Sequence, residues 1–138
     1  MKLSAIAIIT VAMLSLVGCG TSRNQVLSAE EQVKLRSMQT RSFDTTDKNK
    51  TIRAVIATMQ DLGFVVDSAD ETLGTASGTK LDGYQMKLTV SVRPRGQTQM
   101  AVRANAQLGI RSVDDPEPYQ NFFAALSKAM FLEANEVD

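Results

Sequence analysis

The chain has 138 residues, with 15 basic and 15 acidic side chains, one Cys, no His and no Trp. The formal charge is zero, so no basic excess indicates a nucleic-acid partner. Without His, and with a single Cys, the usual zinc and copper ligands are missing and a Ser-His-Asp triad is impossible. We therefore expect a protein that is not an enzyme and that uses neither a metal nor another cofactor.

The first 18 residues have the pattern of an export signal. Lys2 precedes an apolar run of about 15 residues from Leu3 to Val17, which is shorter than the ~20 residues of a membrane-spanning helix. A charged start, an apolar middle and small residues before a cleavage point are typical of a signal peptide. The alternative is an apolar helix buried in a core, but no capping residue ends it and polar residues follow at once. We expect residues 1–18 to be removed.

The stretch Leu16-Val17-Gly18-Cys19 resembles the lipobox of bacterial lipoproteins. The resemblance implies cleavage before Cys19, a diacylglycerol on its sulfur and a third acyl chain on its new amine. Several acyl chains anchor a protein stably, whereas one does not. Gly20, not Asp, follows the Cys, which under the enterobacterial sorting rule implies the periplasmic side of the outer membrane. The alternative location is the periplasmic side of the inner membrane.

Removal of the signal leaves residues 19–138, which are 120 residues with 14 basic side chains (Lys2 is lost) and 15 acidic ones. This length fits one domain. Residues 19–36 are expected to hold the lipidated Cys, a polar tether and a short helix. Ser28 and Glu31 form the pattern of a capping box, which predicts a helix from residue 29 to about residue 35. The rest, 37–138, is predicted to be a single α+β domain.

Three strands and a helix are expected next. Residues 39–45 alternate in the manner of a strand, and their polarity predicts a sheet edge. A helix beginning at Thr46-Asp47 and ending before Gly63 would carry one apolar stripe. The stripe consists of Ile52, Val55, Ile56, Met59 and Leu62. Residues 64–67 are expected to form a short strand, and 73–80 a weak strand with an edge or a bulge.

The clearest pattern is a β-hairpin. Even-numbered residues are apolar on both of its strands: Tyr84, Met86, Leu88, Val90 and Val92, then Met100, Val102, Ala104, Ala106 and Leu108. One face of the hairpin should therefore meet the core. A three-residue loop, 94–96, keeps these residues on one face and pairs Arg93 with Gln97. The same register places Lys87 directly opposite Arg103.

The last helix is predicted to start at Asp115-Pro116, since Asp caps helices and Pro suits their first position. Its apolar stripe consists of Tyr119, Phe122, Phe123, Leu126 and Met130. Together the elements predict an α+β two-layer sandwich. In it, two amphipathic helices cover one face of an antiparallel sheet of about 4–5 strands. The layout resembles the helix-grip domains of outer-membrane assembly lipoproteins.

The mature chain is also similar to a family of small, uncharacterised proteobacterial lipoproteins. The segments that carry the resemblance are Thr40-Arg41-Ser42-Phe43-Asp44-Thr45, Gln60-Asp61-Leu62-Gly63-Phe64, Pro118-Tyr119-Gln120-Asn121-Phe122-Phe123, Leu126-Ser127-Lys128 and Phe131-Leu132-Glu133. These segments are strand, helix and cap signals. The resemblance therefore implies a lipoprotein and supplies no mechanism.

The polar face of the hairpin is a candidate surface for binding a partner. Lys87, Arg93 and Arg103 lie on this face, where they would receive an acidic segment of another envelope protein or anionic headgroups. The alternative is that these long side chains extend into water. The predicted function is that of a membrane-anchored accessory or assembly subunit of a transport or envelope complex, acting by protein–protein contact. A small-ligand or lipid-binding module, with a pocket between helices and sheet, is the alternative.

Overall fold

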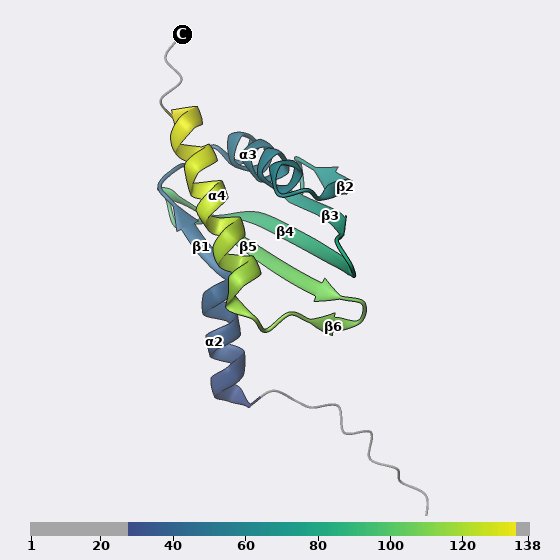
Figure 1. The fold of residues 1–138 in the computed structure, drawn as a ribbon. Coiled ribbons are helices and arrows are strands. Elements are labelled where there is room, and N and C mark those ends of the chain that lie inside the picture. The colour runs from purple at the N-terminus through teal and green to yellow at the C-terminus, as the bar shows by residue number, and fades with distance from the viewer. Residues whose placement is uncertain (1–27, 135–138) are drawn as a thin grey trace, which may run out of the picture.

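The computed structural model describes residues 28–134, so the predictions about the signal peptide, Cys19 and the tether lie outside the described residues. An antiparallel sheet carries two helices, α3 and α4, on one face, while a further helix, α2, extends from one end (Figure 1). The predicted α+β sandwich is confirmed. The elements are α2 (Ala29–Gln39), β1 (Thr40–Phe43), α3 (Lys48–Asp61), β2 (Val65–Asp70), β3 (Thr75–Leu81), β4 (Gln85–Arg95), β5 (Gln99–Leu108), β6 (Arg111–Ser112) and α4 (Pro116–Ala134).

The strand order is β1-β5-β4-β3-β2, and β6 pairs with β5 as well. The first strand therefore lies at an edge, as its polar residues predicted. The other edge is β2, whereas the glycines of β3 had suggested an edge there. The bulge lies in β2, between Val66 and Ser68. The two-residue strand β6 was not predicted.

The predicted capping box at the start of α2 is present. The Ser28 hydroxyl accepts from the Glu31 backbone N–H at 3.3 Å, and the Glu31 carboxylate accepts from the Ser28 N–H at 2.8 Å. These hydrogen bonds from Ser28 lower the pKa of Glu31. A lowered pKa means that the cap stabilises the helix at neutral pH and weakens as the pH falls through that pKa. The helix continues to Gln39, so the boundary expected at residue 36 falls inside it.

Caps also define the two packed helices. The Asp47 carboxylate accepts from the Lys50 N–H at 2.9 Å at the start of α3, and Gly63, at φ 84°, follows its end. At the start of α4 the Asp115 carboxylate accepts from the Glu117 N–H at 2.9 Å. An oxygen that satisfies a free N–H of the first turn is the ordinary function of a helix N-cap. Both helix starts thus confirm the predictions.

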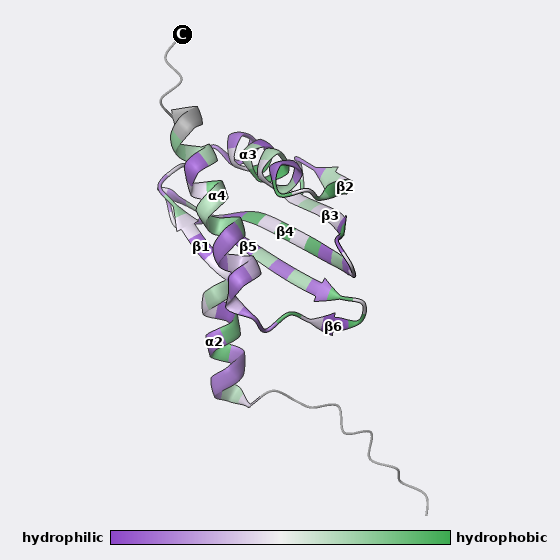
Figure 2. Cartoon of the chain, in the orientation of Figure 1, coloured by the Kyte–Doolittle hydropathy of each residue, from purple (hydrophilic) through white to green (hydrophobic). Residues whose placement is uncertain are grey.

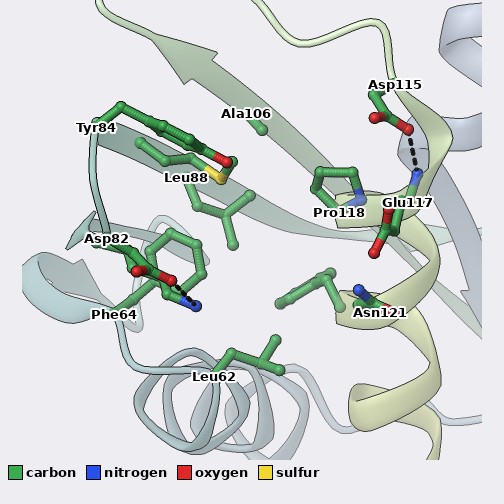
Figure 3. A pocket seen from close by; sticks show the side chains of 13 residues that line it. Leu62, Phe64, Asp82, Tyr84, Leu88, Ala106, Asp115, Glu117, Pro118 and Asn121 are labelled. Atoms are coloured by element: carbon green, nitrogen blue, oxygen red, sulfur yellow. Dashed lines mark hydrogen bonds and ion pairs between the residues drawn. The ribbon is translucent and has the colours of Figure 1, made fainter.

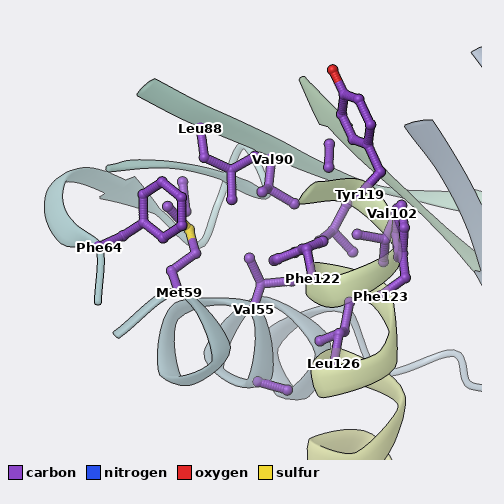
Figure 4. Close-up of a cluster of buried hydrophobic side chains, with 14 of the residues drawn as sticks. Val55, Met59, Phe64, Leu88, Val90, Val102, Tyr119, Phe122, Phe123 and Leu126 are labelled. Atoms are coloured by element: carbon purple, nitrogen blue, oxygen red, sulfur yellow. The ribbon is translucent and has the colours of Figure 1, made fainter. Parts of the chain in front are cut away.

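The core lies between the helices and the even-numbered face of the sheet (Figure 4). Figure 2 shows the alternation of apolar and polar residues along β4 and β5 that produces this face. The Phe122 and Phe123 rings meet edge to face, with centroids 5.2 Å apart. The largest fully buried side chains are Tyr119, Phe122, Ile52, Met59, Leu126, Val55, Val90, Val92, Val102, Thr51 and Thr58. Both predicted helix stripes therefore contribute to one core.

Tyr119 joins three parts of the chain through its buried hydroxyl. This hydroxyl donates to the Val113 carbonyl at 2.8 Å and accepts from the Ala106 N–H and the Gln39 side-chain amide, both at 3.3 Å. Buried polar groups are costly unless paired, and these bonds satisfy several at once. They fix the start of α4 against β5 and against the end of α2.

The register predicted for the hairpin is wrong by two residues on each strand. Arg95 faces Gln99, so the loop consists of residues 96–98 and Pro94 belongs to β4. The predicted pairing of Lys87 with Arg103 is therefore absent. The inward-facing set is nevertheless correct, because a shift of two residues leaves every side chain on its own face.

Pro94 fits inside β4 because of where β3 ends. The last pair between these strands joins Thr75 and Ser91, and the Val92 N–H then donates to the Gly74 carbonyl at 2.7 Å. The nitrogen of Pro94, two residues on, points to the same side of the strand, beyond the end of β3. A residue without an N–H is tolerated at such an edge position.

Candidate functional site

A cleft opens where α3 ends and α4 begins, at one end of the sheet (Figure 3). Its volume is about 310 Å³, at the lower end of the range for ligand pockets. Leu88, Ala106 and Phe122 provide apolar surface from the sheet and α4. Leu62 and Phe64 do so from the chain after α3. A pocket between helices and sheet was the alternative expectation, but its residues could not be named from the sequence, because the walls of this cleft come from five separate segments.

Charged side chains line the two sides of the cleft. On one side the Lys80 ammonium lies 3.9 Å from the Asp82 carboxylate. On the other side are Asp115, which caps α4, and Glu117. Three carboxylates against one ammonium make the lining acidic on balance. The cleft therefore suits a small molecule with an apolar part and a cationic or hydrogen-bond-donating head.

Next to the cleft, large apolar side chains project from the end of the sheet. We call Leu81, Tyr84, Leu108 and Ile110 the apolar tip. Leu81 is 80% exposed, Tyr84 is 62% exposed and Ile110 is fully exposed. The sequence had placed Tyr84 and Leu108 in the core because their alternation matches that of the buried residues. They lie at the strand ends, where β4 begins and β5 stops, and are not buried there.

The predicted partner-binding residues lie on the face of the sheet opposite the helices, as expected. All three are exposed in the structure. Their cross-strand neighbours are neutral: Lys87 faces Gln107, Arg93 faces Ala101 and Arg103 faces Ser91. Arg93 and Arg103 are thus diagonal neighbours, at the distance over which long side chains still interact. Lys87 lies near the start of β4, closer to the apolar tip.

A fourth basic residue, Arg95, extends this group. Its guanidinium donates to the Ser42 hydroxyl at 2.5 Å, which holds it over β1. Arg103 donates to the Gln39 side-chain carbonyl at 3.4 Å. We refer to Arg93, Arg95 and Arg103 as the arginine cluster. Asp44, at the end of β1, accepts a hydrogen bond from the Gln99 side-chain amide at 2.6 Å. The three arginines outnumber this carboxylate, so positive charge predominates at this end of the open face.

The arginine cluster leads to a prediction for Arg103→Glu. The substitution relieves the repulsion between Arg103 and Arg93, which stabilises the fold, and removes the long hydrogen bond to Gln39, which destabilises it. We therefore expect the free energy of unfolding to change by less than ~0.5 kcal/mol. If the cluster receives an acidic partner, crosslinking from membranes should lose that partner. Thermal unfolding and crosslinking of the same variant measure the two effects. Arg53→Glu, on the exposed side of α3, is the control. Equal partner profiles for Arg103→Glu and the unchanged protein would contradict the prediction.

Within residues 28–134, no group of three or more Cys, His, Asp and Glu side chains is placed to hold a metal ion. None of the helices described in that range is both long and apolar enough to cross a bilayer. No protein-family model matches the chain, and no curated protein is significantly similar to it. The site must therefore be interpreted from its own residues.

Proposed function

We propose that the chain is a lipid-anchored envelope protein that acts by binding other molecules and not by catalysis. The observation that supports this best is the short distance in sequence between Cys19 and the folded domain. The domain begins at the capped start of α2, and only residues 20–27 separate Ser28 from Cys19. Whatever conformation they take, these residues span at most about 30 Å. A lipidated Cys19 would therefore keep the domain at the membrane surface.

Within this proposal, the protein is an accessory or assembly subunit of a transport or envelope complex. Two features suit such a role: the arginine cluster, and an open sheet face with short polar side chains between its charges. Gly20 after the modified Cys favours the outer membrane, with the inner membrane as the alternative. The fold is compatible with both.

The anchor is tested by Cys19→Ala. We expect this variant to accumulate as the full-length precursor and to take up no labelled palmitate, because the Cys sulfur is the acceptor of the lipid. Fractionation of cells that contain the unchanged protein shows, in the same experiment, whether it lies in the outer or the inner membrane. Thr21→Ala, two residues further on, is the control and should mature normally. Normal processing and acylation of the Cys19→Ala protein would contradict the proposal.

The cleft supports a second candidate function, the binding of a small amphipathic ligand. Its apolar lining beside the carboxylates of Asp115 and Glu117 favours an ammonium head over a carboxylate head. Glu117→Gln keeps the size of the side chain and removes one charge. We expect alkylamines to bind several-fold more weakly to this variant, since one exposed ion pair contributes up to ~1 kcal/mol. Fatty acids should bind equally well or more tightly, because the substitution removes a negative charge that repels their carboxylate. Calorimetric titration that finds no alkylamine binding to the unchanged protein would exclude this candidate.

A further inference from the structure

We propose that the apolar tip inserts into the surface of the membrane that holds the lipid anchor. The proposal rests on the proposed function, because the anchor is what brings the tip to a bilayer. Insertion of the tip would be a second contact with the membrane, besides the anchor, and would fix the orientation of the domain. The partner is the lipid surface itself, made of acyl chains and phosphate headgroups.

The tip is formed by two turns that the sheet places side by side. Met86 pairs with Leu108 on the neighbouring strands β4 and β5, and the β3–β4 and β5–β6 turns continue from these ends. Leu81 and Tyr84 belong to the first turn, and Ile110 to the second. Figure 2 shows the β5–β6 turn as an apolar segment at the end of a strand in which polar and apolar residues alternate. The exposed side chains of Leu81, Tyr84 and Ile110 thus lie on adjacent turns, an arrangement that suits contact with a bilayer interface.

The charges beside the tip differ between its sides: Asp115 and Glu117 are acidic across the cleft that Tyr84 lines, and basic residues lie around the two turns. Lys80 and Arg111 flank the two turns, and Lys87 lies two residues inside β4 on the open face. Asp82 is the acidic residue of the first turn, and it already faces Lys80 at 3.9 Å. Basic residues near an anionic surface each contribute modestly to binding, and Tyr prefers the interfacial region. Aliphatic burial should therefore dominate, with a smaller dependence on anionic lipid.

The length of the tether makes this contact accessible. About 30 Å is the largest reach of residues 20–27, which is close to the ~28 Å length of α4, with its 19 residues. The start of α2 therefore lies no further from Cys19 than about the length of α4. Figure 1 shows the start of α2 and the β5–β6 turn in the lower half of the view, away from the C-terminal end of α4. The arginine cluster lies at the other end of β4, where it would face the periplasm.

The absence of Trp from the chain allows a clean test. The lipidated protein carrying Ile110→Trp is reconstituted into vesicles of phosphatidylcholine, with or without phosphatidylglycerol. We expect its fluorescence to shift to the blue and to be quenched by lipids brominated on their acyl chains. Leu73→Trp is the matched control. This residue is a 67% exposed aliphatic residue in the β2–β3 turn, at the opposite end of the sheet, so its fluorescence should stay that of a side chain in water.

A second variant separates insertion of the whole tip from an effect of the added Trp. Leu81→Asp in the Ile110→Trp protein should lower the inserted population about tenfold or more, since a buried Leu contributes at least that factor to a transfer equilibrium. Circular dichroism should show unchanged folding, because Leu81 is exposed. Equal quenching of Ile110→Trp and Leu73→Trp, or no effect of Leu81→Asp, would overturn the proposal.

A lack of acylation at Cys19 can be distinguished from a lack of insertion of the tip. The mass of the reconstituted protein shows whether Cys19 carries acyl chains. If it does not, the proposed function fails, and the Ile110→Trp protein added to preformed vesicles still reports on the tip. If Cys19 is acylated and Ile110→Trp remains in water, the tip proposal alone is wrong.

Discussion

Phe122→Ala is expected to destabilise the domain by about 3–5 kcal/mol, the range for removing a buried aromatic ring. Phe122 is 1% exposed, and Figure 4 shows it pointing from α4 into the space between α3 and the sheet. It also meets the ring of Phe123 and lines the cleft. The loss would be a large part of the ~5–15 kcal/mol that stabilises a typical domain. Urea unfolding followed by circular dichroism measures it.

Phe131→Ala is the matched control, because Phe131 belongs to the same helix but is 66% exposed. We expect it to cost less than ~1 kcal/mol, as surface substitutions usually do. An equal unfolding midpoint for the two variants would show that α4 does not pack on the sheet through Phe122. The two-layer core described above would then be wrong.

Gly74→Ala is expected to have the second large effect. Gly74 has a φ of 69°, and an added Cβ would lie 2.6 Å from the Val92 carbonyl oxygen. The positive φ costs a non-glycine residue about 1–2 kcal/mol, and relief of an overpacked contact typically costs about 1–3 kcal/mol more. The Val92 N–H also donates to the Gly74 carbonyl at 2.7 Å, so the two backbones cannot separate without losing that bond. Urea unfolding should show a loss of about 2–5 kcal/mol.

Gly83→Ala separates the two causes. Gly83 has a similar φ of 74°, but no atom lies within 4 Å of the position of an added Cβ. This variant should lose only the ~1–2 kcal/mol of backbone strain. Equal losses for Gly74→Ala and Gly83→Ala would mean that the close approach of the β2–β3 turn to β4 has no energetic consequence.

Most of the fold could be predicted from local patterns. The caps at Ser28, Asp47 and Asp115 marked three helix starts, since a capping side chain acts within its own turn. The periods of the apolar residues identified the buried sides of α3, α4 and the hairpin. The length of α2 was underestimated because its last turn is fixed by a distant contact, between Gln39 and Tyr119.

The register of the hairpin could not be fixed in the same way. The period of two in a strand distinguishes the faces and is unchanged by a shift of two residues. Pro94 favoured a position in the loop, but the end of β3 at Thr75 leaves room for it inside β4. The opposed pair of Lys87 and Arg103 was a consequence of that choice. The side of the sheet on which both residues lie was predicted correctly.

The cleft and the apolar tip depend on where the elements end. Tyr84 and Leu108 continue the alternation of the core residues, yet they lie at the ends of β4 and β5 and are 62% and 37% exposed. Each of the two turns contains a glycine at positive φ, Gly83 at 74° and Gly109 at 60°. Only the strand order brings these turns together beside the start of α4.

Lipidation of Cys19 underlies both the proposed function and the proposed insertion of the apolar tip. The measurement is mass spectrometry of the N-terminal peptide of the native protein extracted from cell membranes. We expect a peptide that begins at Cys19, with a diacylglycerol on the sulfur and an acyl chain on the amine. A mature protein that begins at another residue, or that carries an unmodified Cys19, would contradict the lipid anchor and the functions proposed from it.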